Sequence, residues 1–165
     1  MDAKRDQNSI ILLDKERFVK SSAVDVTDRV LASVNGSSKV AAPGDLFAVS
    51  IRRTDPKSRR MLLASFHGDT NGLATKPIVD GVDKAYREHF TDHDLLMGLD
   101  ANTYKQHDKH WQGVDDFNDF LVSRGLSSCW GAKPDKLKPT TCNARTYLQP
   151  QLNKAIRIQD KLTKG

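Results

Sequence analysis

Two short apolar runs separated by a helical pattern constrain the fold of this chain more than any other feature. The run 61–66 (MLLASF) has the length and composition of a buried strand, and the run 95–98 (LLMG) is a second such segment. Between them, apolar residues recur at helical spacing from Ile78 to Phe90. In a strand–helix–strand unit the two strands run parallel, with their carboxyl ends at one edge of the sheet. The sequence therefore predicts an α/β fold with its ligand site at that edge.

Polar residues that could act on a phosphate follow both apolar runs. His67 comes directly after the first run, and Asp100 and Asn102 come just after the second. An imidazole with an ordinary pKa of about 6.5 suits proton transfer near neutral pH. Taken singly, the histidine could be a structural strand-end residue and the other two could form a turn. Taken together, they favour a functional site.

The flanking segments predict further elements around this unit. The run 46–51 (LFAVSI) predicts a strand, and the loop 54–58 predicts a hairpin that pairs it antiparallel with the run 61–66. The run 9–13 (SIILL) also has strand length. Thr75 is a candidate N-cap for the helix that contains Ile78.

A second helix is predicted over 111–124. One face of it would carry apolar residues that start with Trp111, and Gly125 stands where a helix C-terminal cap is expected. We expect this aromatic face to lie in the core and not to serve as a base-stacking platform. The full face comprises Trp111, Val114, Phe117, Phe120 and Leu121.

Composition limits the class of protein and its partners. The 165 residues suit one domain, and the net charge of +5 with a pI of about 9.2 favours a polyanionic partner such as nucleic acid or another phosphate ester. No run reaches the roughly 18 apolar residues of a membrane span. The polar N-terminus does not read as a secretory signal, which favours an intracellular location, and we expect a monomer.

The two motifs together resemble a known family. The segments 66–70 (FHGDT) and 97–102 (MGLDAN) are similar to the His-bearing and Gly-Asp-x-Asn-type motifs of the endonuclease/exonuclease/phosphatase superfamily, whose type members are deoxyribonuclease I-like. One residue is inserted between Gly98 and Asp100, whereas the Asp-x-Asn triplet is intact. The resemblance implies a mixed-sheet, partial four-layer α/β sandwich. It also implies divalent-metal-dependent hydrolysis of phosphodiester or phosphomonoester bonds, with Mg or Mn as cofactor and a nuclease as the foremost activity.

The same resemblance implies roles for individual residues. Asp100 would orient or deprotonate the attacking water, and Asn102 would bind a phosphoryl oxygen. His67 would hydrogen-bond the scissile phosphate and assist proton transfer. Asp100 and Asn102 would also contribute to the metal site, whose main glutamate we expect outside this chain.

Further polar residues are candidates for substrate binding. Asn71 and Asp69 lie in the loop after His67, and Asn143 and Arg145 lie in a later polar segment. An Arg guanidinium forks well onto phosphate. For each of these residues, loop-stabilising hydrogen bonds are the alternative interpretation.

The chain departs from the family pattern at both ends. No strand pair ending in Gln-Glu precedes Ser9, and no closing Asp-His stands near Gly165. We therefore expect residues 1–165 to be the central portion of one domain, roughly its middle half, with marginal stability and little or no catalysis of its own.

Two alternatives to the phosphoesterase hypothesis stay open. The first is a catalytically inactive nucleic-acid-binding or interaction domain of the same fold. The second is an unrelated α/β interaction domain, in which His67, Asp100 and Asn102 would not converge. Within the enzyme hypothesis, phosphatase and sphingomyelinase-like substrates are also open.

Overall fold

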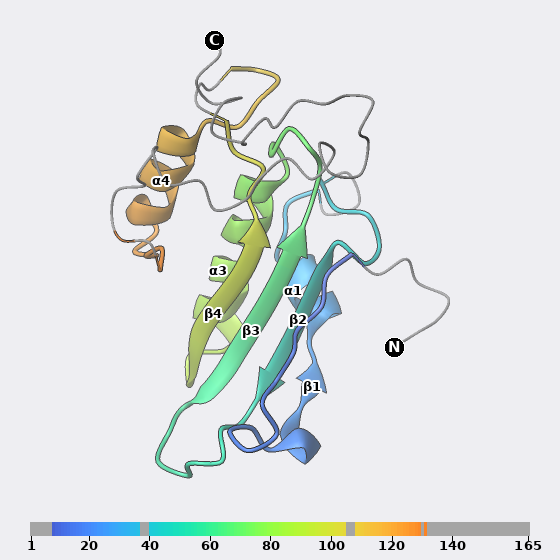
Figure 1. Cartoon of the computed structure of the whole chain (residues 1–165), viewed down its shortest axis with the longest axis vertical. Coiled ribbons are helices and arrows are strands. Elements are labelled where there is room, and N and C mark those ends of the chain that lie inside the picture. The colour runs from blue at the N-terminus through green and yellow to red at the C-terminus, as the bar shows by residue number, and fades with distance from the viewer. Residues whose placement is uncertain (1–7, 37–39, 105–107, 130, 132–165) are drawn as a thin grey trace, which may run out of the picture. The chain divides into compact units, whose positions relative to one another are not determined.

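The computed structural model describes residues 8–36, 40–104, 108–129 and 131, which form two compact units (Figure 1). The first unit comprises the described residues up to Thr70 together with Ala74–Ala101. The second comprises Asn71–Leu73 and the described residues from Asn102 onward.

The first unit contains a four-stranded mixed sheet in the order β1-β2-β3-β4. Strands β1, β2 and β3 pair antiparallel, whereas β3 and β4 pair parallel. This pairing confirms the predicted hairpin and the predicted parallel strand–helix–strand unit. The strands span Val24–Asp25 (β1), Leu46–Ile51 (β2), Arg60–His67 (β3) and His93–Asp100 (β4).

Helices α1 (Thr27–Ala32) and α3 (Thr75–His89) cover one face of the sheet (Figure 1). Their apolar side chains share a core with alternate residues of β2 and β3, because successive strand residues point to opposite faces. The chain around α1 approaches α3 closely at Gly81, where a Cβ atom would lie 2.3 Å from Cγ2 of Val34. The core includes Val30, Leu46, Ala48, Leu62, Ala64, Phe66, Ile78 and Val82.

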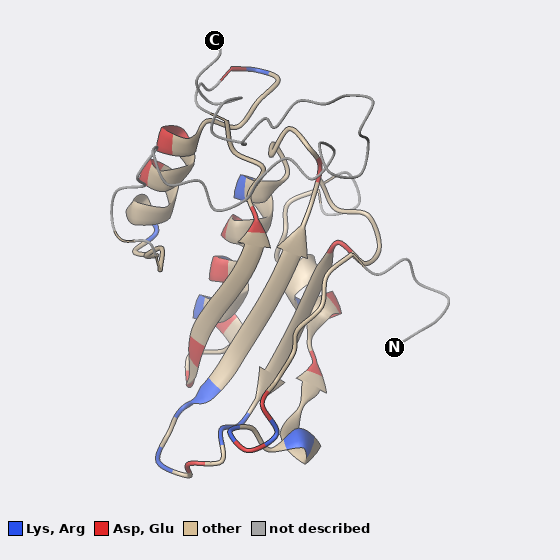
Figure 2. Ribbon diagram, viewed as in Figure 1, with Lys and Arg blue, Asp and Glu red and all other residues tan. Residues whose placement is uncertain are grey.

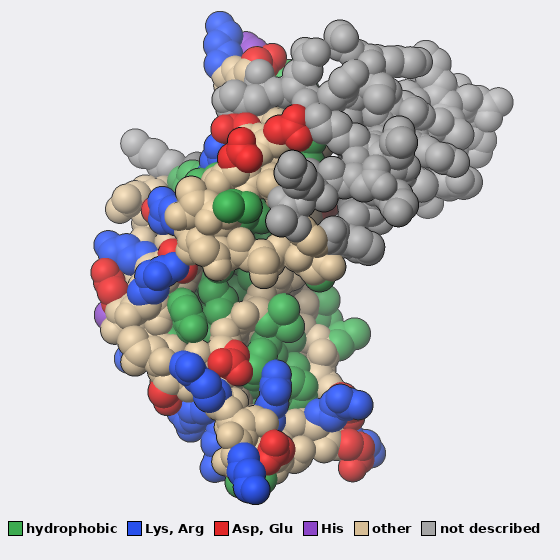
Figure 3. All heavy atoms as spheres, turned by 90° about the vertical axis from the view of Figure 1, so that its left-hand side faces the viewer, with side chains coloured by type: hydrophobic (Ala, Val, Ile, Leu, Met, Phe, Trp, Pro, Cys, Tyr) green, Lys and Arg blue, Asp and Glu red, His purple; other side chains and the backbone are tan. Residues whose placement is uncertain are grey.

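The opposite face of the sheet carries a smaller apolar cluster. Val49, Ile51, Met61 and Leu63 are buried there against partly buried side chains, Ile11 among them. The cover is incomplete. Leu96 pairs in register with Leu63, so it shares this face, and it is 61% exposed. Figure 3, viewed from the β4 side of Figure 1, shows hydrophobic side chains uncovered at the surface. The described residues thus give an α/β fold with helices on one face of the sheet.

Two expected features of the first unit are wrong. The run 9–13 forms no strand, and its start is held by backbone bonds from Asn8 and Ser9 to the carbonyl of Gly44. Thr75 is not the N-cap of α3, which is Ala74. The Thr75 hydroxyl instead donates to the carbonyl oxygen of Ala101 at 3.2 Å, a contact between distant segments that local sequence does not encode.

The second unit contains helix α4 (Val114–Ser123). It starts three residues later than predicted because Gly113 has an extended backbone, which leaves Trp111 outside the helix. The cap expected at its other end is confirmed. Gly125 has φ of +70°, and the N–H groups of Gly125 and Leu126 bond the last carbonyls of the helix. No helix in the described part of the chain has the length and apolar character needed to cross a membrane.

Candidate functional site

Strands β3 and β4 bring His67 and Asp100 side by side. The two residues are register partners, and each is the last residue of its strand. Neighbouring strands lie about 4.8 Å apart, and directly paired residues of a parallel pair point to the same face. Both side chains are exposed. An imidazole and a carboxylate therefore stand together and open to solvent at the carboxyl-end edge of the sheet, where α/β proteins bind ligands.

The end of β3 is fixed on both sides of His67. The His67 amide donates to the carbonyl oxygen of Asp45 at 3.0 Å, which keeps the strand paired up to this residue. Gly68 follows immediately, and a Cβ atom there would lie 2.4 Å from Cζ of the buried Phe66 ring. Glycine thus lets the chain turn over the Phe66 ring directly after presenting the imidazole.

The end of β4 is tied to the start of α3. Thr75 is buried, with 1% of its surface exposed, and its hydroxyl donates to the carbonyl of Ala101. Ala101 is the residue directly after Asp100. This contact therefore fixes the chain at the point where the carboxylate is presented.

Asn102 follows Asp100 by two residues but belongs to the second unit. Its φ is +45°, in the left-handed region that asparagine tolerates better than most residues. The convergence that the structure describes is that of His67 with Asp100.

Of the four further residues predicted to bind substrate, two make local hydrogen bonds and two lie outside the described residues. Oδ1 of Asn71 accepts from the Leu73 amide at 3.1 Å, and Oδ1 of Asp69 accepts from the Ala74 amide at 3.3 Å. Both contacts are turn-forming bonds within the loop. Asn143 and Arg145 lie outside the described residues.

The available donor atoms fit part of a magnesium site. A carboxylate oxygen, such as that of Asp100 in the first unit, is the kind of hard ligand that Mg²⁺ prefers. Mg²⁺ often takes only one or two carboxylates and completes its shell with water and substrate phosphate. Among residues 8–36, 40–104, 108–129 and 131, no group of three or more His, Cys, Asp or Glu side chains could hold a metal.

A second histidine–aspartate pair lies at the amino end of β4, on the helix-covered face. Nδ1 of His93 lies 2.6 Å from Oδ1 of Asp92, and Nε2 lies 2.7 Å from Oγ of Ser50 on β2. The hydrogen bond from the imidazole lowers the pKa of the Asp92 carboxyl below its usual range. This order of groups matches that of a Ser-His-Asp hydrolase triad.

Burial distinguishes this second cluster from a hydrolase site. Ser50 is 5% exposed and His93 is 4% exposed, so a substrate could not reach the hydroxyl. The ring of Phe90 packs edge-on against the imidazole, with 5.1 Å between the centroids. Sequence reasoning missed the cluster, and its one local sign is a serine within the apolar strand 46–51. We interpret it as a structural bridge between β2 and β4.

Several Lys and Arg residues in the described part of the first unit lie far from His67 and Asp100. Figure 2 shows Lys and Arg residues in the turns at the lower end of the sheet. Arg59 and Arg60 precede or begin β3, whereas His67 ends it. At about 3.3 Å per residue, the seven steps from Arg60 to His67 separate the two ends by about 23 Å. Positive charge in this loop thus gives no direct support to a phosphate at the candidate site.

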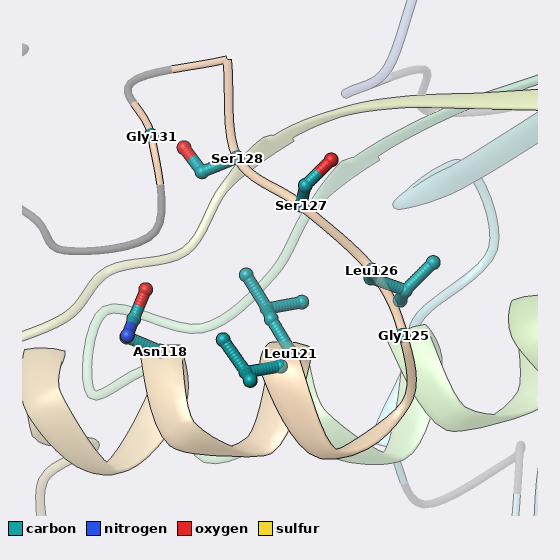
Figure 4. Close-up of a pocket in the computed structure, with 8 residues that line it drawn as sticks. Asn118, Leu121, Gly125, Leu126, Ser127, Ser128 and Gly131 are labelled. Carbon is teal, nitrogen blue, oxygen red and sulfur yellow. The ribbon is translucent and has the colours of Figure 1, made fainter.

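A hollow in the second unit has no acid–base group among its described lining residues. Its volume is about 280 Å³, and it lies where α4 meets the following loop (Figure 4). The residues around it carry only apolar, hydroxyl or amide side chains, or none. They are Asn118, Leu121, Val122, Gly125, Leu126, Ser127, Ser128 and Gly131. This hollow is therefore a weaker candidate for catalysis than the sheet edge.

Comparison of the chain with protein-family models, with curated proteins and with solved structures gave no match. The function proposed below therefore rests on the geometry of the sheet edge and on the two sequence motifs.

Proposed function

We propose that this chain carries part of the active site of a divalent-metal-dependent phosphoesterase, with a nucleic acid as the foremost substrate. The observation that supports the proposal is the pairing of His67 with Asp100 at the carboxyl ends of neighbouring parallel strands. The resemblance of the two motifs to the endonuclease/exonuclease/phosphatase superfamily adds the reaction type. A deoxyribonuclease I-like sandwich is the corresponding proposal for the complete fold.

The two side chains would have complementary roles in hydrolysis. The Asp100 carboxylate can accept a proton from water and orient it toward phosphorus. The His67 imidazole can donate a hydrogen bond to a phosphoryl oxygen and assist proton transfer. Exposure of both groups lets a polymeric phosphodiester reach them without an opening motion of the fold.

A magnesium or manganese ion would be the cofactor, as the resemblance implies. Asp100 and Asn102 are the residues that would contribute ligands to it, and bound metal would neutralise charge on the phosphoryl group. The remaining ligands would come from water, from the substrate phosphate, or from residues other than those described. The basic pI is consistent with a polyanionic substrate.

Hydrolysis under single-turnover conditions tests the proposal. The protein would be held in excess over a 5′-fluorescent single-stranded or duplex oligonucleotide, with MgCl₂ or with EDTA, so that slow cleavage is still measured. We expect slow Mg-dependent cleavage, as befits part of an active site, whose rate constant H67A and D100A lower by about 10²–10⁴. The control H110A replaces an exposed histidine of the second unit and should leave that rate constant unchanged. Cleavage that is absent, or equal in all variants, would overturn the proposal.

An inactive nucleic-acid-binding domain of the same fold is the second candidate. The observation that favours it is the absence, within the described residues, of any group of three potential metal ligands with ionisable side chains. Oligonucleotide binding without cleavage in the same assay would establish it. Neither cleavage nor binding would instead indicate an unrelated α/β interaction domain.

A further inference from the structure

We propose that Tyr104 and Trp111 form a stacking platform for a nucleobase, an inference that rests on the proposed nucleic-acid substrate. Trp111 is 42% exposed, and its ring centroid lies 4.7 Å from that of Tyr104, with 58° between the ring planes. The sequence pattern predicted that Trp111 lies on a core-facing helix. The structure shows that prediction to be wrong, because α4 begins at Val114 and leaves this large ring at the surface.

The backbone holds the two rings in a fixed arrangement. The Tyr104 amide donates to the carbonyl of Gln112 at 2.7 Å, and the Val114 amide donates to the carbonyl of Tyr104 at 2.7 Å. Asp108 and Trp111 form a second, antiparallel bridge. Between these bridges, Gln112 is buried and its side-chain amide donates to Oδ2 of Asp116 at 2.6 Å. A platform ordered before binding loses little further entropy when a ligand stacks on it.

Exposed aromatic surface of this kind suits a flat ring. A base stacked on an aromatic side chain gains about 1–3 kcal/mol, and every base offers such a face. A partly exposed tryptophan ring that the backbone holds in place offers such a face to a ligand.

The charges of the described residues of this unit favour contact with the base more than with the phosphates. The described part of the second unit carries two cationic side chains, Lys109 and Arg124. It carries four carboxylates, which are Asp108, Asp115, Asp116 and Asp119. The guanidinium of Arg124 is already placed 5.0 Å over the Phe120 ring. Among the described residues of this unit carboxylates outnumber cationic side chains, so the neutral ring of a nucleotide, more than its phosphates, is the part that these two rings fit.

Tryptophan fluorescence tests the proposal directly. In a W130F background, Trp111 is the sole tryptophan of the chain. This protein would be titrated, in EDTA to prevent cleavage, with an eight-nucleotide oligothymidine and with an abasic strand of the same length. We expect the oligothymidine to quench Trp111 and to bind about tenfold or more tightly than the abasic strand, which keeps the phosphates but lacks the rings.

Two variants separate stacking from folding. W111L, and Y104L as an independent change, should reduce the preference for the base-containing strand, with circular dichroism as the control for folding. Equal affinity for the two strands, or a preference that survives in both folded variants, would overturn the platform. The platform would also be overturned if a neutral oligosaccharide quenched Trp111 and the oligothymidine did not.

The design distinguishes failure of the platform from failure of the proposed function. H67A should keep the base-dependent quenching, because His67 belongs to the first unit. Quenching without any hydrolysis would leave the platform and reject the phosphoesterase. Hydrolysis without base-dependent quenching would reject the platform alone.

Discussion

The two ends of strands β3 and β4 each carry a histidine and an aspartate, and the pairs differ in what surrounds them. His67 and Asp100 stand exposed at the carboxyl ends. His93, at the amino end of β4, is enclosed between Asp92 and Ser50 and is 4% exposed. The same two residue types therefore offer two exposed acid–base groups at one end, and at the other end a buried histidine that bonds an exposed aspartate and a buried serine. Accessibility, more than residue identity, decides which pair is available for chemistry.

The largest effect that follows from this comparison is on hydrolysis. We expect H67A and D100A to lower the single-turnover cleavage rate constant by about 10²–10⁴, the usual contribution of a positioned acid or base. Their free energies of unfolding should stay within about 0.5 kcal/mol of the wild-type value, because both side chains are exposed. Urea unfolding beside the cleavage assay measures both quantities. If the loss in free energy of unfolding were as large as the loss in transition-state stabilisation, the lower rate would reflect unfolding. The exposed end would then not differ from the buried end in its role.

The next effect concerns the buried Ser50–His93 pair. We expect H93A to lower the free energy of unfolding by about 1–3 kcal/mol, because Ser50 loses the acceptor or donor that satisfies its buried hydroxyl. The cleavage rate constant of the folded variant should match that of the wild type. Urea unfolding and the single-turnover cleavage assay measure these two quantities for H93A. If H93A abolished cleavage without destabilising the fold, the Ser50–His93–Asp92 cluster would be the better candidate for the active site.

Two glycines near the candidate site provide a matched pair of variants. G68A places a methyl group 2.4 Å from the Phe66 ring, and we expect it to lower the free energy of unfolding by about 1–3 kcal/mol. G98A adds the same group to β4, where nothing lies within 4 Å, and we expect a change within about 0.5 kcal/mol. Urea denaturation compares them. Equal effects would contradict the close packing of Phe66 beneath the turn after His67.

The smallest effect is a dependence of stability on acid. The hydrogen bond from His93 lowers the pKa of Asp92 in the folded state. A carboxyl with a lowered folded pKa stabilises the fold above its unfolded pKa of about 3.9, and that contribution disappears as the pH falls through the folded value. In the wild type the urea midpoint of unfolding should fall as the pH drops below about 4. In D92N this fall should be smaller. An unchanged slope in D92N would contradict the role assigned to this bond.

The central part of the fold was predictable from local pattern. Residues 46–51 and 61–66 carry strand-length apolar runs, the turn between them has hairpin chemistry, and α3 has a regular apolar face. Each of these signals lies within one element or between neighbours in sequence. The pairing of β3 with β4, and hence the meeting of His67 with Asp100, followed from the general handedness and packing of strand–helix–strand units.

The failures share a physical cause, since each depends on contacts or backbone geometry outside the local pattern. The helical spacing of Trp111 matched that of Phe117, but the extended backbone of Gly113 separates the two. The bond between Ser50 and His93 joins residues 43 positions apart, so no local window contains it. Helix α1 is only six residues long and has too little periodicity to be distinguished from a loop.

The most direct test of the central claim is whether a phosphodiester and a divalent metal reach His67 and leave His93 untouched. The measurement is a titration of ¹⁵N-histidine-labelled protein with MgCl₂ and a phosphorothioate dinucleotide, followed by NMR of the imidazole rings in the wild type and in D100N. We predict that the His67 ring resonances shift in the wild type, that D100N reduces that shift severalfold, and that the His93 resonances stay in place. Unmoved His67 resonances, or an equal shift in D100N, would contradict a joint phosphate site at the ends of β3 and β4.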